Sequence, residues 1–231
     1  MSNVVETLVA KLEKRFGEAI SVSAAYGEVT AEIAAKDVIP VCTALRDEPE
    51  FAFAQLSDLC AVDYLAFGEA EWQTHDATGS GFSRGVERHP ITADASENDR
   101  RFAVVYHLLS IDHNARLRLK VYLHGEQPII DTVVPIWNVA DWFEREAFDL
   151  FGIMFAGHPD LRRLLTDYGF IGHPFRKDFP LIGNVEMRYD IEKGRVIYEP
   201  VSITPRTLVP KVIRDDALDP PVNRERGEHH G

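Results

Sequence analysis

The sequence has 231 residues, 45% hydrophobic and 27% charged, so it is long and apolar enough for one domain with a sizeable core. Its net charge of −12 argues against nucleic acid or an anionic lipid surface as the main partner. Two cysteines, Cys42 and Cys60, are too few for an ordinary cysteine-bound iron–sulfur cluster or for a structural zinc site with closely spaced ligand pairs. There is no apolar run of membrane-spanning length and no signal-peptide core, so we expect the chain to be kept in a cytoplasm or in an organelle that encodes it.

Four elements are expected in the first 64 residues. An apolar residue at every fourth position from Val4 to Phe16 predicts an amphipathic helix. Alternating residues over 29–33 predict a short strand. Asp37 is expected to cap a second helix, and residues 51–64 are expected to form another strand.

Residues 66–101 are expected to form a long loop insertion, because they are rich in Gly, Ser, Thr and acidic residues. Within them, residues 81–85 match the G-x-S-x-G pattern of a hydrolase, which would make Ser83 the nucleophile. That turn requires an apolar strand before it and a helix after it, whereas the flanking residues here are polar and turn-like. The motif therefore indicates a coincidental match, and no catalytic residue is assigned.

Regular structure is predicted again after residue 101. An apolar run over 102–110 and a clean alternation of apolar and basic residues over 116–123 predict a β-hairpin with one buried face. Residues 129–134 are expected to add a third strand to this meander. Asn138 is expected to cap a helix that ends at Gly152.

Charged residues on the predicted helix suggest local ion pairs. Asp141, Arg145 and Asp149 have the i, i+4 spacing that allows pairing along one side. Glu144 and Glu146 point to different sides of a helix, so they are expected to bind arginines of this domain or of a neighbour rather than to act as an acid–base pair. The apolar residues Val139, Phe143, Ala147 and Phe151 are expected to face the core.

Two Gly-His-Pro triplets, 157–159 and 172–174, follow the helix, each close to a basic doublet. Two histidines are too few for a metal site, so a structural role is favoured, with Pro159 and Asp160 in the first turn of a helix. Nothing near Arg162 or Arg176 offers an obvious local acidic partner, so both are expected to serve assembly.

The composition changes again near residue 185. Six of the thirteen prolines lie between residues 180 and 221, and apolar residues continue without a helical or long strand period. Such a segment is expected to bind along a partner surface. The sequence therefore predicts an α+β fold: a two-layer domain with a mixed sheet packed against helices over 1–184, and an extended proline-rich segment over 185–231.

Four blocks resemble one family: the 30 kDa subunit, also called the C subunit, of proton-translocating NADH:quinone oxidoreductase, or respiratory complex I. The blocks are Glu144–Ile153, His158–Arg163, Gly172–Leu181 and Glu186–Tyr189. Phe175 stands where the family usually has leucine. The resemblance implies a cofactor-free, non-catalytic subunit of the peripheral arm, in a complex that transfers electrons from NADH to quinone and pumps protons.

The resemblance also implies partners and a location. FMN and the iron–sulfur clusters would lie in other subunits, and the chain would contact the large quinone-site subunit and the subunit that bears the terminal cluster. The complex would hold it on the cytoplasmic side of a bacterial inner membrane. An equivalent subunit of a membrane-bound hydrogenase-type complex is an alternative, and a free-standing serine hydrolase is a less favoured one.

Residues of the four blocks are expected to stabilise the fold or to contact partner subunits. None of them is expected to be catalytic or to bind a cofactor or a metal. They are Glu144, Arg145, Glu146, Asp149, Gly152, His158, Pro159, Asp160, Arg162, Arg163, His173, Pro174, Arg176, Lys177, Asp178, Glu186, Arg188 and Tyr189.

Overall fold

The computed structural model describes residues 2–65, 67–68, 72–74, 86–88 and 100–204. The chain divides into two compact units. One comprises residues 1–65 and 94–201, and the other comprises 66–93 and 202–231. Among the described residues no helix is long and apolar enough to cross a membrane. The motif around Ser83 and most of the predicted loop insertion lie outside the described residues.

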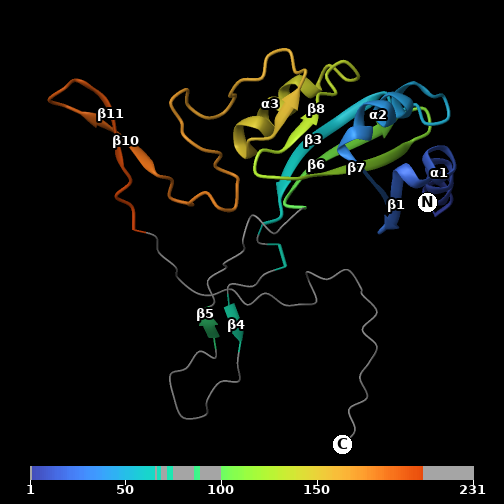
Figure 1. The fold of residues 1–231 in the computed structure, drawn as a ribbon, viewed down its shortest axis with the longest axis horizontal. Helices are drawn as coiled ribbons and strands as arrows, with labels where there is room; N and C mark the ends of the chain where they lie inside the picture. Colours follow the sequence, from blue (N-terminus) through green and yellow to red (C-terminus); the bar gives the residue numbers. More distant parts are fainter. Residues whose placement is uncertain (1, 66, 69–71, 75–85, 89–99, 205–231) are drawn as a thin grey trace, which may run out of the picture. The chain divides into compact units, whose positions relative to one another are not determined.

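A five-stranded mixed sheet is the centre of the larger unit (Figure 1). Its strands lie in the order β1 (Ile20–Ala25), β2 (Glu28–Ile33), β7 (Ala115–Leu123), β6 (Phe102–Ser110) and β3 (Gln55–Asp63). β2 and β7 are parallel, and the other neighbours are antiparallel. The predicted α+β class with a mixed sheet is confirmed.

Three helices contribute to a single core on one face of this sheet. They are α1 (Ser2–Phe16), α2 (Val38–Asp47) and α3 (Ala140–Phe151), and two 3-10 turns, Gly17–Ala19 and Ala35–Asp37, precede β1 and α2. Leu12 of α1, Leu45 of α2 and Ala147 of α3 belong to the same buried cluster as Leu119 and Val121 of β7. The helices bury their apolar sides there because isolated helices of this length are only marginally stable in water.

Strand β7 shows why the sheet has one buried and one open face. Its residues alternate without exception between buried apolar side chains, such as Leu117 and Leu119, and more accessible ones, such as Arg118 and Lys120. Successive side chains of a strand point to opposite faces, so this alternation fixes the register of β7 in the sheet. The hairpin of β6 and β7 is as predicted.

Several predicted elements differ from the structure. Residues 129–131 form β8, which pairs in parallel with β9 (Met154–Ala156) instead of joining the main sheet. β1 was not expected, because Ser and Ala give it little apolar alternation. α3 begins after Val139, without the predicted Asn138 cap, and the Asp37 side chain makes no capping hydrogen bond to α2. Val139 is exposed rather than part of the core.

The C-terminal region is also more regular than predicted up to residue 200. β10 (Val185–Asp190) and β11 (Arg195–Pro200) form an antiparallel hairpin, and Arg188 and Glu199 form an ion pair across it at 2.8 Å. The sequence analysis expected an extended segment without a long strand period from residue 185 onward, and it did not identify this short hairpin over 185–200. In the smaller unit, β4 (Trp72–Thr74) pairs with β5 (Val86–Arg88). Residues 205–231 lie outside the described part.

Candidate functional site

The segment 157–184 packs against the end of α3, and this contact brings most of the predicted site residues together. α3 ends as predicted at Gly152, which has a φ of 74° and whose N–H donates to the carbonyl of Phe148 at 2.8 Å. A Cβ on Gly152 would lie 2.6 Å from ring atoms of His173 and 2.7 Å from an Arg176 nitrogen. Glycine is therefore needed for both the left-handed backbone and the close approach of this segment.

The last carbonyl groups of α3 receive hydrogen bonds from residues 173–176. His173 Nδ1 donates to the carbonyl of Asp149 at 2.9 Å, the Phe175 N–H donates to that of Leu150 at 3.0 Å, and Arg176 Nε donates to that of Phe151 at 2.6 Å. A helix end has no intrahelical donors for these carbonyls, so the segment completes the helix. Burial lowers the pKa of His173, and the positive charges of Arg176 and Arg163 lower it further.

The Asp149 side chain accepts more hydrogen bonds than any other predicted site residue in the described part of the chain. Its carboxylate is fully buried and accepts hydrogen bonds from the backbone N–H groups of Leu164, Leu165 and Thr166 at 3.0, 2.7 and 2.9 Å. The Thr166 hydroxyl and Arg163 also donate to it, the latter at 2.9 Å. Burial alone would raise the pKa of Asp149, but these hydrogen bonds lower it well below its usual range. The carboxylate thus fixes the loop 163–166 on α3.

A second buried ion pair connects the segment to the sheet. Arg101 donates to both carboxylate oxygens of Asp63 at 3.1 and 3.0 Å, and Arg101 also lies 2.9 Å from Asp178. The N–H of Lys177 donates to Asp63 at 2.8 Å. Sequence reasoning did not assign Arg101 or Asp63 to the site. The available signal was an aspartate at a core-facing position of a strand, because such a charge is buried only with a partner.

Glu144 does not bind an arginine, contrary to the prediction. Its side chain is fully buried, and its carboxylate accepts hydrogen bonds from the Thr132 hydroxyl and from the N–H of Val133, the latter at 2.7 Å. Burial raises the pKa of Glu144 to about 7, although those two hydrogen bonds oppose the shift. The protonated form of this carboxyl group is therefore stable to a higher pH than that of an exposed glutamate.

The buried imidazole of His158 lies beside Glu144, with Nε2 3.9 Å from that carboxylate and 3.2 Å from Asp141. His158 Nδ1 accepts a hydrogen bond from the N–H of Asp160 at 3.0 Å, so the proton of the neutral ring is on Nε2. Both ring nitrogens of His158 thus have partners within the protein. The predicted helix at Pro159 and Asp160 is absent, because residues 157–163 form a turn and irregular structure.

The remaining predicted residues fall into two groups. Arg145 is buried, lies 5.2 Å from the Trp142 ring and donates to the carbonyl of Arg162 at 3.4 Å, so the predicted pairing with Asp141 and Asp149 is wrong. Arg162 forms an exposed ion pair with Asp160 at 2.8 Å. The other predicted residues are at least partly accessible: Glu146, Pro174, Lys177, Asp178, Glu186, Arg188 and Tyr189.

Apolar side chains of residues 165–198 point away from these buried contacts. Tyr168, Ile171 and Leu181 are 98%, 83% and 103% exposed, respectively. Further exposed apolar residues follow in the same segment: Leu165, Phe175, Val185, Met187, Tyr189, Ile191, Val196 and Tyr198. A cavity of about 390 Å³ lies between residues 167–184 and the β10–β11 hairpin. Phe170, Phe179 and Tyr198 are among the residues that line it. We call residues 165–198 the apolar segment. Exposure on this scale is typical of a protein-binding surface.

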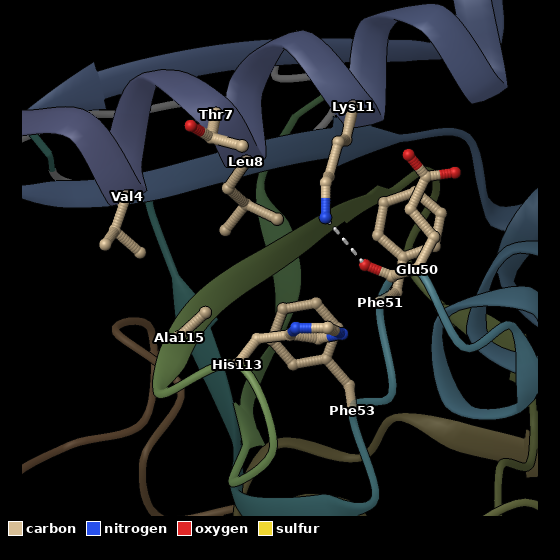
Figure 2. Close-up of a pocket in the computed structure, with 9 residues that line it drawn as sticks. All are labelled: Val4, Thr7, Leu8, Lys11, Glu50, Phe51, Phe53, His113 and Ala115. Carbon is tan, nitrogen blue, oxygen red and sulfur yellow. Dashed lines mark hydrogen bonds between the residues drawn. The ribbon is translucent and has the colours of Figure 1, made fainter.

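Figure 2 shows a separate cavity beside α1, of about 290 Å³. Leu8 and Val4 of α1 form one wall, and Phe51 and Phe53 form the other. The Lys11 ammonium donates to the carbonyl of Glu50 at 3.2 Å, and His113 Nε2 lies 2.9 Å from the carbonyl of Pro49. Lys11 and His113 thus both bind backbone carbonyls of residues 49–50, which indicates a structural contact of α1 and the β6–β7 turn with the segment 49–53.

Comparison with known proteins identifies the family. Residues 31–185 match the family described as respiratory-chain NADH dehydrogenase, 30 Kd subunit. The C subunit of NADH-quinone oxidoreductase from Coxiella burnetii (strain Dugway 5J108-111) is 55% identical over 223 residues, which cover 96% of this chain and 98% of that protein. The protein of the same description from Legionella pneumophila (strain Corby) is 58% identical over 212 residues, covering 91% and 93%.

The fold is also found in a solved structure described as the membrane-bound sulfane sulfur reductase, an archaeal respiratory membrane complex. One of its chains superimposes with a TM-score of 0.50 at 15% identity, covering 77% of this chain and 86% of that one. This likeness concerns the fold alone. The chain belongs to the family of the 30 kDa subunit of respiratory-chain NADH dehydrogenase. The prediction made from the four sequence blocks is thus confirmed, and the hydrogenase-type alternative is not favoured.

Proposed function

We propose that this chain is a non-catalytic subunit of NADH-quinone oxidoreductase that binds neighbouring peripheral-arm subunits through its apolar segment. The proposal rests on one observation: in this region several charged side chains point inward and many apolar side chains point to solvent. The charged residues of the family blocks, chiefly Asp149, Arg163 and Arg176, are used in contacts within the chain. The apolar residues between them, such as Tyr168 and Ile171, are left exposed. The blocks therefore shape a binding surface.

The proposed partners are the large quinone-site subunit and the subunit that bears the terminal cluster. FMN and the iron–sulfur clusters would lie in partner subunits, because the two thiols of this chain cannot supply an ordinary cluster. Binding would place the chain on the cytoplasmic side of a bacterial inner membrane. Positioning of redox partners is a sufficient role for such a subunit, since a displacement of about 1 Å at a reacting site can cost a factor of about 100 in rate.

The proposal is tested by affinity purification of the tagged full-length chain from its native membrane, followed by mass spectrometry. We expect Ile171→Asp and Leu181→Asp to reduce recovery of the quinone-site and cluster-bearing subunits at least about tenfold, because each places a charge in an apolar interface. Ile111→Asp is the matched control, since Ile111 is 68% exposed in the β6–β7 turn, outside the apolar segment. Equal recovery with all three variants would contradict the proposal.

A further inference from the structure

The open face of the sheet carries a group of three side chains that the assembly role does not use. Asp58 and Cys60 lie two residues apart on β3, and His107 lies on the neighbouring strand β6, where its backbone partner is Asp58. One carboxylate oxygen, the thiol sulfur and one imidazole nitrogen all lie within 4.8 Å of one another. Within the described part of the chain, these side chains form no hydrogen bond or ion pair with other residues.

An irregularity in β3 creates this arrangement. Leu56 pairs with Leu108, but the next pair is Asp58 with His107, so Ser57 is an extra residue in the ladder. A regular strand would direct Leu56 and Asp58 to the same face, which is the core face. The bulge instead keeps Leu56 in the core and turns Asp58 to the open face with Cys60. Bulges are a common device for redirecting a side chain at a site.

We propose that Asp58, Cys60 and His107 form a binding site for a divalent zinc-like cation. Thiolate, imidazole and carboxylate are the three protein ligands of zinc, and three of them leave a fourth tetrahedral position for water. Tetrahedral ligands at bond lengths of about 2.0–2.3 Å lie roughly 3.5 Å apart, so small rotations of these side chains would close the site. Asp58 is exposed and the other two are half-buried, so an ion can enter from solvent.

The charges around the sulfur favour a cation. The carboxylates of Asp58 and Glu146 act electrostatically on the Cys60 sulfur, and their negative charge attracts a cation, whereas Arg118 opposes it. Arg118 is itself paired with Glu28 at 2.6 Å. The second thiol offers a contrast: Cys42 is fully buried in the core, where burial raises its pKa to about 12. The proposed site differs from the expectation that no residue of the chain binds a metal, which was based on the scarcity of thiols and on the small number of histidines in the Gly-His-Pro triplets.

The test uses Co²⁺ as a spectroscopic probe and Zn²⁺ in titration calorimetry on the full chain. The background carries His229→Gln and His230→Gln, so that this adjacent histidine pair contributes no binding. We expect one ion per chain and a thiolate-to-cobalt charge-transfer band that Zn²⁺ abolishes. Cys60→Ser should remove the band, and His107→Gln should weaken Zn²⁺ binding by at least about tenfold, since even indirect ligand support contributes about 10–100-fold.

Cys42→Ala and His124→Gln are the matched controls, one a thiol in the core and the other an exposed histidine. Both should keep the band and the affinity, and the thermal transition of each variant shows whether it is folded. Absence of the band in the folded background protein, or its persistence in Cys60→Ser, would overturn the proposal. Recovery of assembled subunits is measured separately and does not depend on this outcome.

Discussion

Asp149 is an ionised carboxylate inside the protein, and its five donors all come from the segment that follows α3. A buried charge is stable only when its partners are complete, so this residue makes the position of the loop 163–166 depend on one side chain. Arg163 extends the contact, because its other nitrogen donates to the carbonyl of Gly172 at 3.0 Å.

Asp149→Asn should destabilise the protein by about 3 kcal/mol at pH 7, because it leaves Arg163 without its anionic partner. The pKa of Asp149 is lowered in the folded state, so its contribution is complete above the unfolded pKa of about 4 and is lost as the pH falls further. Urea denaturation at pH 7 and pH 3 measures both effects. A difference between wild type and variant that is the same at both pH values would contradict the ionic role.

Glu144→Gln should show the opposite pH dependence. The folded protein raises the pKa of Glu144 to about 7, so it retains this proton more tightly than the unfolded chain. The resulting stability is complete below the unfolded pKa of about 4.3 and is lost as the pH rises towards 7. Relative to wild type, the glutamine variant should therefore gain roughly 2–4 kcal/mol between pH 4 and pH 7. Parallel stability curves over this range would contradict a raised pKa.

Gly152→Ala should destabilise the protein by at least about 2 kcal/mol, because both the left-handed backbone and the contact with His173 and Arg176 oppose a methyl group. Gly27→Ala separates the two causes. Gly27 has a φ of 81° but no atom within 4 Å of the added Cβ, so only the backbone cost of about 1 kcal/mol applies. Equal losses in the two variants, measured by urea denaturation, would show that the packing contact contributes nothing.

At the scale of elements, hydrogen bonds and ion pairs hold the segment 157–184 on α3. The segment satisfies the end of the helix through His173 and Arg176, and it is joined to the sheet where Lys177 and Asp178 meet Asp63 and Arg101. Each basic doublet thus has one residue in an internal contact, Arg163 or Arg176, and one exposed residue, Arg162 or Lys177. Arg162 is on the surface, whereas Arg176 lies against the Phe102 ring, 5.0 Å from its centroid.

Because Arg162 is exposed and Arg176 is held in an internal contact, charge reversal should have different effects at the two positions. Arg162→Glu should leave stability within about 0.5 kcal/mol of wild type, as expected for an exposed site, and any loss of partner recovery would then be an interface effect. Arg176→Glu should instead destabilise the fold by about 3 kcal/mol or more, because a negative charge would face the carbonyl of Phe151. Thermal unfolding compared with partner recovery distinguishes the cases. An Arg176→Glu protein of wild-type stability would show that the carbonyl contact is unimportant.

Sequence patterns predicted the elements whose apolar residues have a clear period, such as α1 and the β6–β7 hairpin. They did not predict β1 or the β8–β9 pair, because a short strand with Ser and Ala, or with only three residues, carries little periodicity. The site residues were predicted from family blocks, but their partners were not. Glu144 with Thr132 and Asp63 with Arg101 are contacts across the fold, which spacing along one helix or strand cannot reveal.

At the scale of the whole molecule, the sequence predicts a boundary between residues 184 and 185, with a partner-binding segment after it. The hairpin of β10 and β11 belongs to the larger unit, which makes residue 201 a second natural place for truncation. We expect chains 1–184 and 1–201 both to retain cooperative unfolding, because the sheet and three helices precede these positions.

The two truncated chains should differ in assembly. The 1–184 chain lacks Met187, Tyr198 and the other exposed apolar residues of the hairpin, so it should recover fewer partner proteins than the 1–201 chain. Affinity purification from the native membrane measures this, with the full chain as the reference. Equal recovery by the two truncations would restrict the binding surface to residues before 185, and loss of cooperative unfolding in 1–184 would contradict the predicted boundary.

The parallel pairing of β2 with β7 also determines when this protein can fold. Thr30 and Arg118 are register partners although 88 positions separate them in the chain. At roughly 5–20 residues per second, the ribosome needs about 4–18 s to make the sequence between them. During that interval the β1–β2 hairpin has an unpaired edge, which is a risk for association with other chains. The β2–β7 pairing can form only after β7 has been made, so we expect synthesis speed and chaperone access at this stage to affect the yield of native protein.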